Sequence, residues 1–193
     1  MSKTYKSIIK DGLWYKNPGL VQFLGLCPLL AVSTSFKNGA TLGIATIIVL
    51  TCSNLLIAIL KNIIPFYLRI PIFVLIIAGF VTLCQITLAA VNYNLYHNLG
   101  LFLALITTNC AVLGRIEAFA YKNTPRKALL DGLMQGLGFT LVLIFLGFIR
   151  EVFTSTTKLT PVDSEFLFFI LPPGAFIILG FLIAFKNYLG QKN

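Results

Sequence analysis

The sequence predicts an all-α integral membrane protein with six transmembrane helices. The chain has 193 residues, of which 58% are hydrophobic and only 11% are charged. Its mean hydropathy of +0.90 lies far outside the range of soluble domains. Six apolar segments run along the chain, and at about 20 residues each they use most of it. The rest suffices for loops and tails, so a nucleotide-binding or hydrolytic domain outside the membrane is excluded.

The elements follow in order from the spacing of apolar and basic residues. In residues 1–17, apolar side chains recur at helical spacing with lysines off that face, which predicts an interfacial N-terminal helix on the membrane surface. The predicted spans cover residues 18–36, 39–60, 70–91, 99–120, 128–149 and 166–185. Residues 18–91 form a first three-span repeat, and residues 92–193 form a second repeat with a short C-terminal tail.

The net charge of +9 favours contact with anionic lipid and not nucleic acid, because the basic residues stand singly between apolar segments. At the alternating ends of six spans, twelve Lys and Arg fall on one side and three on the other. The three are Lys37, Arg150 and Lys158. By the positive-inside rule, both termini are expected to be cytoplasmic.

Two of the predicted spans carry residues that interrupt a helix. Cys27 and Pro28 stand in the middle of the first span, and Pro172, Pro173 and Gly174 stand within the last. Irregular backbone at membrane depth requires protein or a cofactor around it. An ordinary proline kink explains the last span equally well, whereas the cysteine beside Pro28 favours a functional break in the first.

The two halves of the chain share a short pattern around a cysteine. Residues 27–31 read Cys-Pro-Leu-Leu-Ala, and residues 110–114 read Cys-Ala-Val-Leu-Gly. Because three spans per repeat is an odd number, the two repeats would insert in inverted orientations, with broken helices at spans one and four. Cys27 and Cys110 would then meet near the middle of the bilayer.

All four cysteines lie within apolar segments, so free thiols or metal ligands are expected and disulfides are not. Residue type alone favours buried thiols, which behave as small hydrophobic groups. Cys52 and Cys84 could complete a set of four ligands within this chain, but they have no counterparts in the other repeat and are favoured as core thiols. If Cys27 and Cys110 are ligands of an iron-sulfur cluster, which usually needs four cysteines, a second chain must supply the other two.

Motifs along nearly the whole chain point to one family of membrane proteins. The motifs are residues 17–32, 69–72, 108–115 with 117–120, 131–132, 150–151 and 171–176. They resemble the family that contains the E subunit of the Rnf complex, also called Rsx, and the D subunit of the sodium-pumping NADH:quinone oxidoreductase. The Cys-Pro-Leu-Leu and Arg-Ile-Pro-Ile forms favour the Rnf branch.

The resemblance implies a membrane component of an ion-translocating electron transport complex of the ferredoxin:NAD oxidoreductase type, in the bacterial inner membrane. It implies a homologous sister chain, the A subunit of the Rnf complex, in inverted orientation, together with the B, C, D and G subunits. The pair would share one 2Fe-2S cluster at the membrane midplane, with Cys27 and Cys110 as the two ligands from this chain. The chain would then relay electrons and perform no substrate chemistry itself.

Two other functions fit parts of the pattern. Inverted repeats with broken spans also suit a small secondary transporter, although a transporter needs polar substrate groups at the midplane, where this sequence has cysteines. A structural scaffold without a cofactor is the third possibility.

The chain departs from the family pattern at two places. The loop between Glu151 and Phe166 is shorter than is usual in the family, and the C-terminal tail is abbreviated. Contacts with partners outside the membrane are therefore expected to differ from those of the family.

Polar residues near the spans have simpler expected roles. His97 is expected at the surface of the loop between spans three and four. Glu117 and Asp131 are expected at solvated loop ends, and Glu117 stands too close in sequence to Arg115 to face it on a helix. Interhelical hydrogen bonds are expected from Asn54, Gln85, Asn109 and Gln135. Close helix contact is expected at Gly132, Gly136 and Gly138. Asn109 also adjoins Cys110, where a hydrogen bond to sulfur would tune a cluster.

Reporter fusions test the predicted topology. The charge asymmetry places both termini in the cytoplasm and residues 93–98 outside, so fusions at the C-terminus and after residue 98 should report opposite compartments. A phosphatase active outside and a fluorescent protein active inside would measure this. The same compartment at both positions would contradict the six-span arrangement.

Overall fold

The computed structural model describes residues 5–32, 35–157 and 172–191, and within these ranges it contains helices and no strand. The α-helices are α1 (Tyr5–Lys10), α2 (Leu26–Val32), α3 (Phe36–Leu60), α4 (Arg69–Val91), α5 (Tyr93–Ala104), α6 (Cys110–Ala118), α7 (Pro125–Thr157) and α9 (Pro172–Gln191). A π-helical turn follows α1 at Asp11–Tyr15, and 3-10 turns lie at Phe66–Leu68 and Ala120–Lys122. The all-α prediction is confirmed for the described residues.

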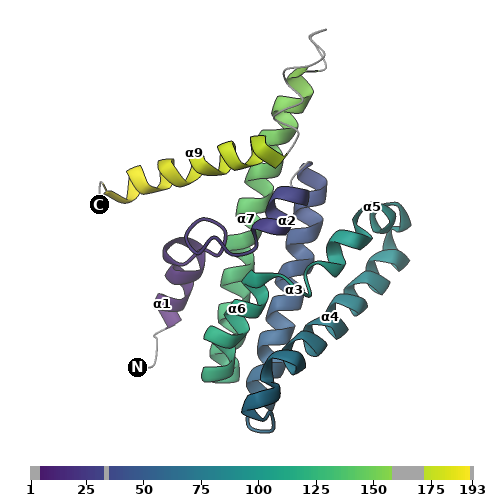
Figure 1. Cartoon of the computed structure of the whole chain (residues 1–193), viewed down its shortest axis with the longest axis vertical. Helices are drawn as coiled ribbons and strands as arrows, with labels where there is room; N and C mark the ends of the chain where they lie inside the picture. The colour runs from purple at the N-terminus through teal and green to yellow at the C-terminus, as the bar shows by residue number, and fades with distance from the viewer. Residues whose placement is uncertain (1–4, 33–34, 158–171, 192–193) are drawn as a thin grey trace.

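Helices α3 and α7 form the central pair of the molecule, and the shorter helices pack around them (Figure 1). Glycines let the two backbones approach closely. A Cβ atom at Gly132 would lie 2.9 Å from the Cα of Thr51, and one at Gly136 would lie 3.0 Å from the Cα of Ile47. The close contact expected at these two glycines is therefore confirmed, as is that at Gly138, which meets the Gly12 carbonyl of the N-terminal segment.

Three helices are long and apolar enough to cross a membrane, in the part of the chain that the structure describes. They are Phe36–Leu60, Phe66–Val91 and Pro125–Val152. They correspond to the second, third and fifth predicted spans and lie close to the predicted bounds, with α7 extending further at both ends. A shorter apolar helix covers Pro173–Tyr188, in the position of the sixth predicted span.

The first and fourth predicted spans are not continuous helices. Among the described residues of the first, α2 is helical, and turns, a bend and irregular backbone occupy residues 16–25. In the fourth, α5 ends at Ala104 and α6 begins at Cys110. The predicted interruption of these two spans is therefore confirmed. The predicted loop around His97 is wrong, because His97 lies within α5, where its side chain is exposed.

The N-terminal segment packs on α7 instead of standing apart from the bundle. Ile8 is 1% exposed, whereas Ile9 and Leu13, predicted on the same apolar face, are 37% and 38% exposed. The π-helical turn after α1 brings Gly12 against Met134 of α7. Part of the predicted apolar face thus contacts protein, and the rest is left for lipid.

Helix α9 covers the last predicted span from residue 172 onward. Pro172 opens α9, a position that suits proline because the first N–H groups of a helix have no partner within it. The residues before Pro172 lie outside the described part of the chain, so a break or kink at Pro172 and Pro173 stays a prediction. The predictions for Lys158, for the start of this span at residue 166 and for most of the loop before it lie outside the described residues.

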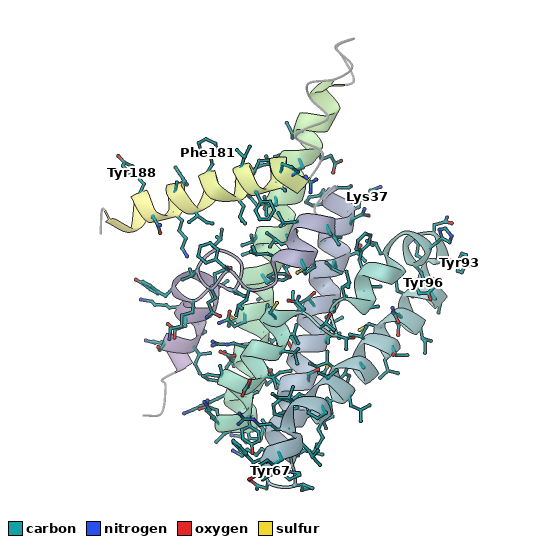
Figure 2. The ribbon with its side chains drawn as sticks, viewed as in Figure 1. Lys37, Tyr67, Tyr93, Tyr96, Phe181 and Tyr188 are labelled. Atoms are coloured by element: carbon teal, nitrogen blue, oxygen red, sulfur yellow. The ribbon has the colours of Figure 1, made fainter. Side chains whose placement is uncertain are left out.

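One apolar core joins α2 through α9, and much of the remaining apolar surface is exposed. Only 17% of the most apolar stretch of α4 is buried, against 56% of the corresponding stretches of α3 and α7. Figure 2 shows Lys37 and Tyr93 well above Tyr67 along the long axis. Large exposed apolar surfaces of this kind require lipid or another protein chain to cover them.

Alanine substitutions of two glycines test the α3–α7 contact. Gly132→Ala should lower the free energy of unfolding by about 1–3 kcal/mol, because the new methyl group meets backbone. Gly79→Ala is the matched control, because a Cβ at Gly79 would have no atom within 4 Å apart from its chain neighbours and the backbone of its own helix. Thermal unfolding of the detergent-solubilised proteins measures both. Equal melting temperatures for the two variants would contradict the close packing.

Candidate functional site

The two matched cysteines stand at corresponding places in two short helices. Cys27 is the second residue of α2, and Cys110 is the first residue of α6. Both side chains are exposed, whereas Cys52 and Cys84 are partly buried. Cys84 packs against the main apolar core. The interpretation of Cys27 and Cys110 as buried core thiols is therefore wrong, and the same interpretation suits Cys84.

The chain turns that precede the two cysteines lie against each other. Gly25 adopts a left-handed conformation with φ of 76°, and a Cβ atom there would lie 2.9 Å from Asn109 Oδ1 and from the Phe139 ring. A Cβ atom at Gly114 of α6 would lie 3.5 Å from Leu24 Cδ1. Glycine at position 25 therefore permits both the turn and its contact with the Cys110 segment.

Asn109 begins α6 as its N-cap residue. Its Oδ1 accepts a hydrogen bond from the Ala111 N–H at 3.0 Å. Its main-chain carbonyl accepts from the N–H groups of Val112 and Leu113, each at 3.0 Å. This cap fixes where the helix starts and hence where Cys110 stands. The side chain is 3% exposed, and its Nδ2 has no hydrogen-bond partner among the described residues.

Arg150 of α7 holds the far end of α2, and the neighbouring Glu151 holds the start of α3. Arg150 Nη1 donates a hydrogen bond to the Leu30 carbonyl at 3.0 Å. The neighbouring Glu151 Oε2 accepts one from the Phe36 N–H at 2.7 Å, at the start of α3. A cation at the C-terminal turn of one helix and an anion at the N-terminus of the next both complement helix dipoles. The two residues thus join α2 to α3 and fix the helix that carries Cys27.

Asn17 anchors the irregular segment that leads into α2. Its Nδ2 donates to the Gly138 carbonyl of α7 at 2.9 Å. Its Oδ1 accepts from the Gly19 N–H at 3.0 Å. Both ends of this 3%-exposed carboxamide are therefore used, in contrast to Asn109. Sequence reasoning missed the roles of Asn17, Arg150 and Glu151, although all three fall within the family motifs.

A buried ion pair fastens α6 to α7. Arg115 Nε donates to Asp131 Oδ2 at 2.7 Å, a second bond joins Arg115 Nη2 to Asp131 Oδ1, and Asp131 is 0% exposed. Gln135 lies 3.2 Å from both Arg115 Nη2 and the Lys16 carbonyl, and one orientation of its amide satisfies both. The prediction that Asp131 is solvated is wrong, because α6 folds back onto α7 and covers it.

The remaining polar residues bridge neighbouring helices. Glu117 pairs with Arg69 at the start of α4, with 2.8 Å between Oε1 and Nη2, and its side chain is 44% exposed. Asn54 Nδ2 donates to the Ala128 carbonyl at 3.3 Å, and Gln85 Nε2 donates to the Gly100 carbonyl at 3.0 Å. The predicted interhelical hydrogen bonds of Asn54 and Gln85 are therefore confirmed.

The described residues include all four cysteines, yet nowhere among them do three or more His, Cys, Asp or Glu side chains gather as a metal site. The exposed Cys27 and Cys110 stand on touching segments and face out of this chain. This arrangement suits a site completed by a second chain.

These features define an α-helical membrane protein in which two interrupted segments present cysteines at a surface. The family described as "Rnf-Nqr subunit, membrane protein" matches residues 5–183, and the chain belongs to this family.

Its relatives share most of its length. A protein of Shewanella loihica is named as the E subunit of an ion-translocating oxidoreductase complex. It is 48% identical over an alignment of 206 residues, which covers 97% of this chain and 89% of that protein. A protein of the same name from Aliivibrio fischeri is 49% identical over 207 residues, covering 98% of this chain and 91% of its own length. The resemblance to the E subunit that the motifs indicated is confirmed.

Substitutions at the buried ion pair test its structural role. Asp131→Ala leaves the Arg115 charge buried and should lower the free energy of unfolding by about 3–5 kcal/mol. The double variant with Arg115→Met should lose less than the sum of the two single variants. Melting temperature and the yield of inserted protein measure the effect.

Glu117→Gln is the control for the ion pair, because its partly exposed pair with Arg69 should contribute about 0–1 kcal/mol. Similar, small effects of the changes at Asp131 and Glu117 would contradict a role for the buried pair in holding α6.

Proposed function

We propose that this chain, as part of an ion-translocating oxidoreductase complex, relays electrons across the bilayer. In this proposal Cys27 and Cys110 supply two of the four ligands of a 2Fe-2S cluster, and a homologous sister chain, the A subunit of the complex, supplies the other two. The observation that carries the proposal is the exposure of these two cysteines at the starts of two helices whose preceding turns touch.

The contacts between helices support two inverted three-span repeats. If α2, α3 and α4 correspond to α6, α7 and α9, then the contacts of α2 with α7 and α9 have counterparts in those of α6 with α3 and α4. The central α3–α7 pair then joins two equivalent helices. An inverted repeat places its two equivalent broken segments near the membrane midplane, which is where such proteins hold functional groups.

The residues around the two cysteines fit an anionic sulfur-ligated cluster. Cys110 is the first residue of α6, where the helix dipole favours a thiolate. Gly25 lets its turn pack directly against Asn109, and any larger residue would prevent this contact. When bound, such a cluster supplies a one-electron redox centre partway across an apolar core of roughly 30 Å.

In this proposal the chain positions the cluster and excludes water from it. The cap at Asn109 and the Arg115–Asp131 pair fix Cys110, and Arg150 fixes α2 with Cys27. The apolar core behind both helices excludes water. A rigid, apolar surrounding sets the potential of a buried metal centre as much as its ligands do.

The charge pattern supports cytoplasmic termini in the inner membrane of a bacterium, and the relatives are named as components of a complex. We propose that the B, C, D and G subunits complete it. The exposed apolar faces of α4 and α9 are available for these contacts and for lipid, with Phe181 and Tyr188 projecting from α9 (Figure 2).

Iron analysis with single cysteine variants tests the proposal. Expressed alone, the chain should bind no cluster, and purified together with the sister chain it should carry about two irons per pair. Cys27→Ala and Cys110→Ala should each abolish iron binding and transmembrane electron transfer, because an incomplete ligand shell leaves iron labile. Iron and acid-labile sulfide are measured beside the yield of the assembled pair.

Cys52→Ala and Cys84→Ala are the matched controls. Each removes a small, partly buried group and should cost about 1 kcal/mol while iron and electron transfer are retained. Equal, mild effects at all four positions would show that Cys27 and Cys110 are not ligands. Iron in the unpartnered chain would instead point to Cys52 and Cys84 or to a homodimer.

A further inference from the structure

Asn109 carries a buried hydrogen-bond donor that the described part of the chain leaves unused. The side chain is 3% exposed, and its Nδ2 has no partner among the described residues. A buried amide without a partner costs about 1–3 kcal/mol. A native protein keeps such a group where a ligand, water or another chain completes the hydrogen bond.

The orientation of this carboxamide is set by its own helix. Oδ1 accepts from the Ala111 N–H at 3.0 Å, so the oxygen is the capping atom and the NH2 group points elsewhere. The same Oδ1 lies 2.9 Å from the position that a Cβ of Gly25 would take. The carboxamide therefore stands between the start of the Cys110 helix and the turn that ends two residues before Cys27.

We propose that Asn109 Nδ2 donates a hydrogen bond to a sulfur atom of the cluster held by Cys27 and Cys110, either a bridging sulfide or a cysteine thiolate. Asn109 is then a positioning residue that raises the reduction potential of the cluster. The inference rests on the proposed function, since it needs a cluster at these two cysteines.

The physical reason is the charge that a reduced cluster gains. An N–H donor stabilises negative charge on sulfur, and it stabilises the reduced form more because that form carries one more negative charge. In a dry surrounding this effect is larger than it would be in water. Loss of the donor should therefore favour the oxidised form.

Asn109→Ser tests this in the purified pair of this chain with its sister chain. Serine keeps an N-cap oxygen for the Ala111 N–H but has no amide. We expect unchanged iron content and a midpoint potential more negative by about 59 mV, which corresponds to a tenfold change in the one-electron equilibrium. Redox titration followed by electron paramagnetic resonance measures the potential.

Asn54→Ser is the matched control. Asn54 is an equally buried asparagine of α3 whose Nδ2 already donates to the Ala128 carbonyl, so its substitution should affect melting temperature and leave the potential unchanged. An unchanged potential in an iron-replete Asn109→Ser pair would overturn the inference, and so would an equal shift from Asn54→Ser.

A second measurement needs no variant. In the reduced pair prepared with asparagine labelled with 15N in its side chain, pulsed electron paramagnetic resonance should detect coupling of the cluster to that nitrogen and to an exchangeable proton. Absence of both couplings in a pair with a full cluster would overturn the inference alone. Absence of iron from the unaltered pair would overturn the proposed function and the inference with it.

Discussion

A helix that begins inside a membrane leaves its first N–H groups without partners, and hydrocarbon offers none. The arrangement of this molecule depends on how that constraint is met at α2 and α6. Asn109 satisfies the start of α6 with its own side chain, and Asn17 does the same for the turns that lead toward α2. The last carbonyl groups of a helix also have no partner within it, and Arg150 donates to one of them in the last turn of α2. Each interruption is thus held by hydrogen bonds within the chain.

The central pair of helices gives these interruptions a common support. Glycines at positions 132 and 136 bring α3 and α7 together, so α7 can offer backbone and side chains to both broken segments. The Gly138 carbonyl of α7 accepts a hydrogen bond from Asn17, and Asp131 of the same helix forms an ion pair with Arg115. One rigid helix therefore positions both cysteine-bearing segments. In our proposal this support, with the turns of Gly25 and Asn109 in contact, holds two ligands of one cluster at the surface shared with the sister chain.

The sequence predicts the parts of this structure that depend on local composition. Uniformly apolar runs identify α3, α4 and α7, and the Cys-Pro pair stands in the first turn of α2, just after the break in the first span. The sequence does not predict the features that depend on long-range contacts. Asp131 looks like a loop residue in sequence, and only the fold of α6 onto α7 buries it beside Arg115. The unused donor of Asn109 is likewise invisible without its surroundings, although its place beside Cys110 marks it as a candidate. Six spans and inverted repeats stay predictions.

Anomalous diffraction at the iron absorption edge, from crystals of this chain with its sister chain, is the sharpest test of the proposed ligand set. We expect anomalous density for one two-iron cluster per pair at the interface, with iron within bonding distance of the sulfur atoms of Cys27 and Cys110. A peak bonded to Cys52 or Cys84, or a fully assembled pair with no iron peak in contact with either predicted ligand, would contradict the proposal.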